Sequence, residues 1–194
     1  MTDGALTAEE ILVAAEEALR RFGPDKATVV DVARALGVSH GSVYRHFASK
    51  AALRDAVAHR WLARVEEPLA AIAAADSPPP QRLRRWFDEF RRLKREKALG
   101  DPELFATYNA LAAEARDVVT AHVDALVAQL ERIVRDGVAS GDFAVTSVPA
   151  TARALFSATQ RFHHPMHSGE WGTPENDQAF EQVWDLLERA LRPR

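Results

Sequence analysis

Hydrogen-bonding side chains gather in one short stretch of the sequence, GVSHGSVYRHFASK, at residues 37–50. The stretch combines hydroxyl groups, imidazoles, a phenol, a guanidinium and an ammonium behind a glycine-led turn. These groups donate and accept hydrogen bonds, and they are suited to contact base edges and phosphates when a helix lies in the major groove of DNA. The chemistry indicated is recognition of a nucleic acid by a surface of polar side chains.

A helix-turn-helix would place these side chains correctly, since it needs a small residue where two short helices meet and a turn residue free of strain. Ala33 and Gly37 meet the two needs. Apolar residues on the inner faces are expected to hold the helices together, namely Val32, Leu36, Val38, Val43 and Phe47. The third helix then exposes His40, Gly41, Ser42, Tyr44, Arg45 and His46. Ser39 caps this helix, and Lys50 adds a cation at the start of the next one, where free backbone N–H groups favour a phosphate.

Helix start and stop signals define four amino-terminal helices. Thr7 and Glu10 form a capping box, Thr28 is suited to be an N-cap, and Gly23 with Pro24 ends the first helix. Pro68 is expected to interrupt the fourth helix. The expected bounds are 7–22, 28–37, 39–47 and 49–67.

The remaining sequence also shows apolar residues at helical spacing, with further helices expected near 82–97, 101–111, 119–137, 148–163 and 174–191. No convincing strand appears. We therefore expect an all-α fold of about nine helices. A helix-turn-helix DNA-binding domain at 1–50 is followed by a helical effector-binding and dimerisation domain at 51–194, and helix 50–67 connects the two.

Composition narrows the function. The chain of 194 residues is 47% hydrophobic and 27% charged, which is typical of a globular protein. The absence of cysteine excludes disulfides and thiolate metal sites. No secretion signal or membrane span is apparent, so we expect a cytoplasmic protein that does not contact a membrane. The net charge is −3, but residues 39–60 carry a local net charge of +3.

The pattern of the first 60 residues resembles the TetR family of bacterial transcriptional regulators. The residues in register with that family are Ala33, Gly37, Val38, Ser39, Val43, Tyr44, Phe47, Ser49 and Lys50. The resemblance implies a homodimer that binds a palindromic double-stranded DNA operator, together with a carboxy-terminal body that binds a small-molecule inducer. We expect a ligand-responsive regulator, a repressor rather than an activator.

The same resemblance implies individual roles for the DNA-binding residues. Tyr44, His46 and Lys50 are expected to contact phosphates, and Thr28 caps the second helix beside the DNA backbone. His40 and Ser42 are expected to read bases. A dimer also follows from physical need, because one three-helix module offers few contacts for specific binding. The last two helices are expected to form that interface through Leu155, Phe162, Phe180, Trp184 and Leu187.

A largely apolar effector pocket is expected in the carboxy-terminal body, where aromatic residues alternate with a few polar ones. The expected lining residues are Trp86, Phe90, Phe105, Tyr108, Asn109, Phe156, Gln160, His163 and His164. The identity of the effector does not follow from these residues.

Two alternatives remain open from the sequence. The first is a helical adaptor whose basic third helix binds an acidic protein, and the second is a metal-dependent hydrolase that uses the histidines. His163 and His167 have a metal-ligand spacing, but Pro165 lies between them. No nucleophile elbow or phosphate loop is present, so we expect no enzyme, no bound metal and no cofactor. The run at 82–97 carries a net charge of +5 and is expected to be a solvated helix face.

Overall fold

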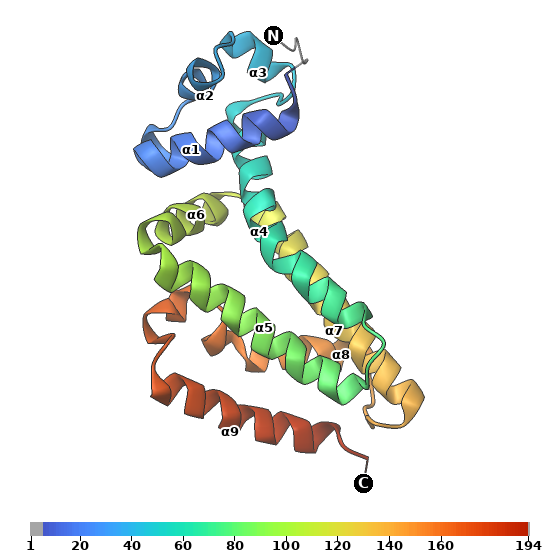
Figure 1. Ribbon diagram of the computed structural model, residues 1–194. Coiled ribbons are helices and arrows are strands. Elements are labelled where there is room, and N and C mark those ends of the chain that lie inside the picture. Colours follow the sequence, from blue (N-terminus) through green and yellow to red (C-terminus); the bar gives the residue numbers. More distant parts are fainter. Residues whose placement is uncertain (1–5, 194) are drawn as a thin grey trace. The chain divides into compact units, whose positions relative to one another are not determined.

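The computed structural model describes residues 6–193, and within this range the protein is all-α, as the sequence predicts. Nine α-helices and two short 3-10 helices are present in the described residues, with no strand (Figure 1). The bounds are α1 Ala8–Lys26, α2 Val29–Ala35, α3 His40–Tyr44, α4 Lys50–Ala74, α5 Pro79–Gly100, α6 Pro102–Glu114, α7 Arg116–Ser140, α8 Val148–Ala158, η1 Gln160–Phe162, η2 Pro165–Glu170 and α9 Pro174–Leu191.

The chain divides into two compact units. Described residues up to Leu62 form the first unit together with Glu103–Thr120, and Ala63–Pro102 with Ala121 onward form the second. The division therefore falls inside α4 and α7, and α6 belongs with the amino-terminal helices. The domain boundary expected at residue 50 stays a prediction about function.

The first unit has its own small apolar core. Ile11, Val32, Val43 and Val57 come from four different helices and are each almost completely buried. Trp61 of α4 stacks on Tyr108 of α6, with ring centroids 5.0 Å apart and planes 4° from parallel. This aromatic pair adds apolar area to a module that three short helices alone would leave marginal.

The second unit is built around the aromatic face of α5. Trp86, Phe87 and Phe90 are buried there against residues of α7, α8 and α9. Figure 1 shows α9 lying alongside α5 and running in the opposite direction. Phe180 and Trp184 of α9 are buried in the same core, together with Leu155 and Phe162. The expectation that these four residues form a dimer interface is therefore wrong, because they already pack inside one protomer.

Helix ends differ from the expected ones where distant packing outweighs a local signal. Gly23 has φ 78°, so the regular part of α1 ends there, as predicted, before one more turn reaches Lys26. The expected break at Pro68 is wrong, because α4 continues to Ala74. The residues beyond the proline, Leu69 and Ile72, are buried in the core of the second unit, and this burial offsets the lost backbone hydrogen bond. Helix α3 ends at Tyr44, earlier than the expected Phe47.

Candidate nucleic-acid interface

The turn between α2 and α3 has the geometry that its glycine predicts. Gly37 adopts φ 67°, in the left-handed region where a β-carbon is strained. The N–H of Val38 donates to the carbonyl of Ala33 at 3.0 Å, and that of Gly37 donates to Arg34 at 3.2 Å. These two bonds make a Schellman motif, which ends α2 and fixes the direction in which the chain enters α3.

Helix α3 turns one apolar residue inward and its polar residues outward. Val43 is 1% exposed and anchors the helix in the core of the first unit, while Tyr44 is 42% exposed. Ser42 is half-buried. The other predicted DNA-binding residues are all exposed, namely Thr28, Ser39, His40, Gly41, Arg45, His46 and Lys50. All nine residues that the sequence selected therefore lie in the first unit, eight exposed and one half-buried.

Hydrogen bonds within α3 order several of these side chains before any ligand is bound. Ser39 accepts from the N–H of Ser42 at 3.2 Å as the N-cap, and the two hydroxyls lie 3.0 Å apart. Arg45 donates to the Ser42 hydroxyl at 3.2 Å. The rings of His40 and Tyr44 meet edge to face, with centroids 6.3 Å apart. Ordered side chains lose less conformational entropy on binding, which favours recognition.

Capping groups fix the flanks of the interface. Thr28 caps α2, and its hydroxyl accepts from the N–H of Asp31 at 3.2 Å. The hydrogen bond from the Thr28 hydroxyl lowers the pKa of the Asp31 carboxyl. At the start of α4, the Ser49 hydroxyl accepts from the N–H of Ala52 at 3.0 Å. Lys50 is therefore held at the positive end of a capped helix.

The cations of the first unit fall into two groups. Arg54 pairs with Glu114 at 2.9 Å, and Arg60 pairs with Glu9 and Glu16, so these charges are neutralised within the unit. Arg45 and Lys50 have no carboxylate partner among residues 6–193. Both cations belong to the predicted interface, where a phosphate would be their partner. Lys26 of α1 likewise has no carboxylate partner among residues 6–193, but it lies outside that interface.

The expected effector residues fall in both units. Phe105, Tyr108 and Asn109 lie in the first unit on α6, where Phe105 and Tyr108 are buried against Trp61 and Asn109 is half-buried. The others lie in the second unit: Trp86, Phe90, Phe156 and His163 are buried, while Gln160 and His164 are exposed.

The buried members of the second group form one ring cluster. The His163 imidazole lies 4.6 Å from the Phe90 ring and 4.7 Å from the Phe156 ring, measured between centroids. The rings are in mutual contact, and a pocket lined by all nine residues stays a prediction.

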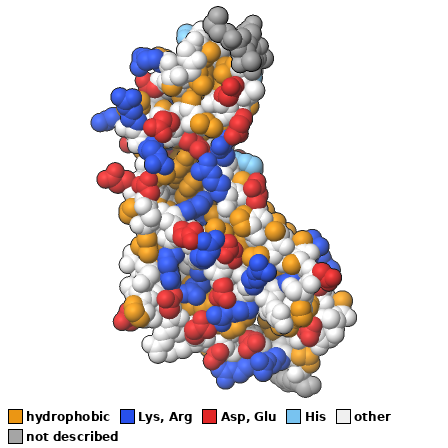
Figure 2. Space-filling model, viewed as in Figure 1, with side chains coloured by type: hydrophobic (Ala, Val, Ile, Leu, Met, Phe, Trp, Pro, Cys, Tyr) orange, Lys and Arg blue, Asp and Glu red, His pale blue; other side chains and the backbone are white. Residues whose placement is uncertain are grey.

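Part of the basic run on α5 forms an interhelical ion-pair layer, so the expected solvated face describes only the exposed remainder, such as Arg85 and Arg92. Arg84 pairs with Glu181 of α9 at 2.7 Å and with Asp88 at 2.8 Å, and Arg91 pairs with Asp177 of α9 at 2.6 Å. On the face in Figure 2, basic and acidic side chains are interspersed over the second unit.

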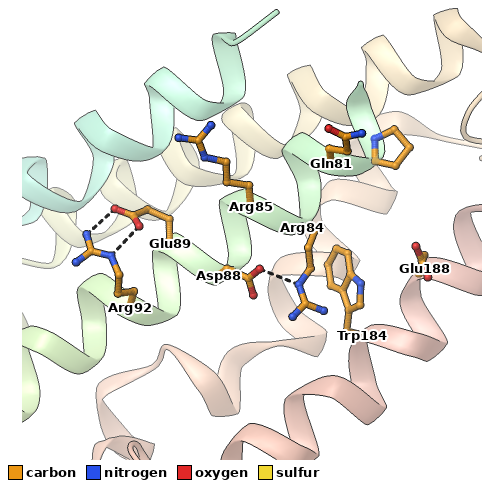
Figure 3. A pocket seen from close by; sticks show the side chains of 9 residues that line it. Gln81, Arg84, Arg85, Asp88, Glu89, Arg92, Trp184 and Glu188 are labelled. Carbon is orange, nitrogen blue, oxygen red and sulfur yellow. Dashed lines mark hydrogen bonds and ion pairs between the residues drawn. The ribbon is translucent and has the colours of Figure 1, made fainter. Parts of the chain in front are cut away.

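One surface groove of about 540 Å³ follows this ion-pair layer. Figure 3 shows the Arg84 guanidinium between Asp88 and the Trp184 ring, and the distance from the guanidinium carbon to the ring centroid is 5.3 Å. Arg92 in the same groove bonds to Glu89. Of the three arginines that line the groove, Arg84 and Arg92 are thus already paired with carboxylates.

The described residues contain no group of three His, Asp or Glu side chains arranged to hold a metal ion. None of the helices from Ala8 to Leu191 is both long and apolar enough to cross a membrane.

Comparisons with known proteins agree with this geometry. Residues 11–57 match the family described as bacterial regulatory proteins, tetR family, and residues 79–184 match the family described as tetracyclin repressor-like, C-terminal domain. Two HTH-type transcriptional regulators of Mycobacterium tuberculosis are 35% identical to the chain over 78 residues, which is 40% of this chain. The match spans about two fifths (39%) of the length of these curated relatives.

Solved structures share the fold over nearly the whole chain. The repressor SmeT of the Stenotrophomonas maltophilia multidrug efflux pump SmeDEF is 20% identical, with a TM-score of 0.68, and the alignment covers 97% of this chain and 91% of SmeT. The regulator FadR of Bacillus subtilis, solved in complex with stearoyl-CoA, is 15% identical, with a TM-score of 0.65 and coverage of 96% and 100%. Since the two family matches together span most of the sequence, the chain belongs to the tetR family of bacterial regulatory proteins.

Proposed function

We propose that the protein is a ligand-responsive transcriptional repressor that binds a palindromic DNA operator as a homodimer in the cytoplasm. The observation that carries the proposal is the α3 surface, where His40, Tyr44 and Arg45 are exposed beside an unneutralised Lys50. The ligand response is supported by family membership and by the fold shared with FadR of Bacillus subtilis, which was solved in complex with stearoyl-CoA. The metalloenzyme and adaptor alternatives gain no support.

Each α3 would enter one major groove, with Tyr44, His46 and Lys50 on phosphates and His40 and Ser42 on base edges. A twofold dimer would place two such helices about 34 to 36 Å apart, or a multiple of that spacing. Gly41 supports a close approach, because a β-carbon added there would meet only the Ser39 hydroxyl, at 3.7 Å. Replacing Gly41 therefore tests DNA contact without disturbing the fold.

The dimer surface we propose lies on α8 and α9. Leu186 of α9 is 65% exposed, and Val183 and Leu187 of the same helix are half-buried. A groove of about 460 Å³ separates the two helices and is lined by alanines of α8 together with Leu187 and Leu191. Apolar area left in water on one helix pair is typical of an interface between copies. Sedimentation at micromolar concentration tests it: a dimer is expected, and Leu186→Glu should give a monomer.

The operator is best found by selecting bound fragments from a random DNA pool with the full-length chain. Fluorescence anisotropy on the selected duplex then compares three variants. Lys50→Ala should weaken binding to all sequences and reduce the slope of log affinity against log salt by about 1. His40→Ala should change sequence preference, and Gly41→Ala should weaken binding while leaving the unfolding temperature intact.

Arg135→Ala provides the matched control, because Arg135 is an exposed cation on α7 of the second unit. Its DNA affinity and salt slope should equal those of the wild type. The regulator proposal fails if no sequence is enriched from the pool, or if Lys50→Ala and His40→Ala both bind like the Arg135→Ala control.

A further inference from the structure

A lysine of α5 is buried without a counter-charge. Lys94 is only 7% exposed, and it has no hydrogen bond and no carboxylate partner among residues 6–193. Its neighbours on the helix differ, because Arg91 and Arg95 pair with Asp177 and Arg92 pairs with Glu89. Arg85 also has no ion-pair partner among the described residues but is exposed, so Lys94 combines burial with the lack of a counter-charge.

The surroundings of Lys94 are aromatic and nitrogen-rich. The ammonium lies 5.5 Å from the centroid of the Phe90 ring, and Phe90 in turn contacts His163 and Phe156. Burial lowers the pKa of Lys94 to about 8. Burial and the charge of Lys94 together lower the pKa of His163 to about 3, and the same two causes contribute to a lowered pKa of His164. The titratable groups facing Lys94 are thus two neutral imidazoles.

The hydrogen bonds of His163 show that it is no substitute for a counter-ion. Its Nε2 lies 3.2 Å from the carbonyl oxygen of Phe156, which only accepts, so Nε2 carries the proton and donates. The Thr159 hydroxyl lies 3.3 Å from the same nitrogen and donates to the carbonyl of Leu155 at 2.9 Å. The imidazole of His163 and the Thr159 hydroxyl thus bond to each other and to backbone carbonyls, and neither bonds to the ammonium of Lys94.

We propose that the effector of this protein is a monocarboxylate with an apolar body, whose carboxylate pairs with Lys94 while its body packs among the rings of Phe90, Phe156 and His163. The inference rests on the proposed function, since it names the ligand class to which the regulator responds. A buried ammonium is costly without an anion, and one unpaired cation matches one negative charge. The rings contact one another in this structure, so they must separate as the ligand enters.

The same geometry gives the binding a pH dependence. A carboxylate needs Lys94 protonated, and above about pH 8 the free protein must take up a proton in order to bind. Affinity should therefore fall by up to about tenfold for each pH unit above 8. His163 and His164 stay neutral in this range and add no dependence of their own.

Isothermal titration calorimetry on the full-length chain tests the proposal with matched probes. Phenylacetate and decanoate are compared with phenylacetamide and decanamide, which keep the body of each probe and lack its charge. The wild type should bind at least one carboxylate at least about tenfold more tightly than its amide. Lys94→Met should abolish that preference and the pH dependence, while Lys97→Met, a change of equal charge three residues along α5, should retain both.

Three results would overturn the proposal: equal binding of acids and amides, an unchanged preference in Lys94→Met, or no binding of either acid up to about 1 mM. Anisotropy with the selected operator and no probe keeps the two proposals apart. If the wild type prefers carboxylates but binds no DNA, the regulator proposal is rejected and the Lys94 proposal is kept. If it binds DNA but shows no preference for carboxylates, the Lys94 proposal is rejected and the regulator proposal is kept.

Discussion

Replacing Lys94 with methionine is expected to raise the free energy of unfolding of the second unit. The pKa of Lys94 falls from 10.5 to about 8 on folding, which corresponds to a cost of about 3 kcal/mol for holding the charged form in the core. Below about pH 8 both the folded and the unfolded chain hold the proton, so the wild type carries the full cost there. Methionine has a similar length and no charge, so Lys94→Met does not carry this desolvation cost.

The pH dependence provides the sharper test. Between about pH 8 and 10.5 the unfolded chain binds more protons than the folded chain, so the wild type gains stability as pH rises. Urea denaturation followed by circular dichroism should show Lys94→Met more stable by about 3 kcal/mol near pH 7 and by about 1 kcal/mol near pH 9.5. Lys26→Met, at an exposed site on α1, should show neither effect. The reasoning would be refuted if Lys94→Met were no more stable than the wild type at neutral pH. It would also be refuted if the difference in their free energies of unfolding did not change with pH.

Four other substitutions have definite expected outcomes. The pKa of His163 is lowered to about 3, so below pH 6.5 the unfolded chain takes up a proton that the folded chain does not. The free energy of unfolding of the wild type should therefore fall by up to about 1.4 kcal/mol per pH unit. His163→Gln should reduce this slope in acid denaturation. The β-carbon that Gly37→Ala adds would meet no atom within 4 Å, but alanine is strained in the left-handed conformation of this residue. Urea denaturation should show the free energy of unfolding lowered by about 1 kcal/mol for Gly37→Ala and unchanged for Gly41→Ala. Gly137→Ala would place a β-carbon 2.1 Å from the buried Phe143 ring and should cost about 1 to 3 kcal/mol, measured in the same way; an unchanged midpoint would show that the ring moves freely.

Signals that act over a few residues were sufficient to predict most of the fold. The capping box at Thr7 and the N-cap at Thr28 start α1 and α2 as expected, and Asp31 completes a second capping box that was not predicted. The left-handed Gly37 fixes the turn in the same local way. The exposed face of α3 follows because burial of Val43 leaves its neighbours in solvent. Both the helix-turn-helix and its polar surface can therefore be predicted from the sequence alone.

Features that depend on residues far apart in the sequence could not be predicted. Pro68 predicts a helix end locally, yet burial of Leu69 and Ile72 in the second unit carries α4 past it. The partners of the α5 arginines are just as remote, since Arg84 and Glu181 are separated by 97 positions. No pattern within residues 82–97 distinguishes a cation that finds such a partner from one that does not.

The two lysines to which we assign a ligand both lack a carboxylate partner among the described residues, unlike several arginines of the same units. Arg54 and Arg84 have carboxylate partners inside their own units and therefore stabilise the fold. Lys50 on the surface and Lys94 in the core have none among the described residues. An unneutralised cation is tolerated in water but costly in an apolar core, so the second case requires a stronger reason to persist. We propose a different anion for each lysine, a phosphate for Lys50 and a carboxylate for Lys94, and substitution of one should leave the binding of the other's anion intact.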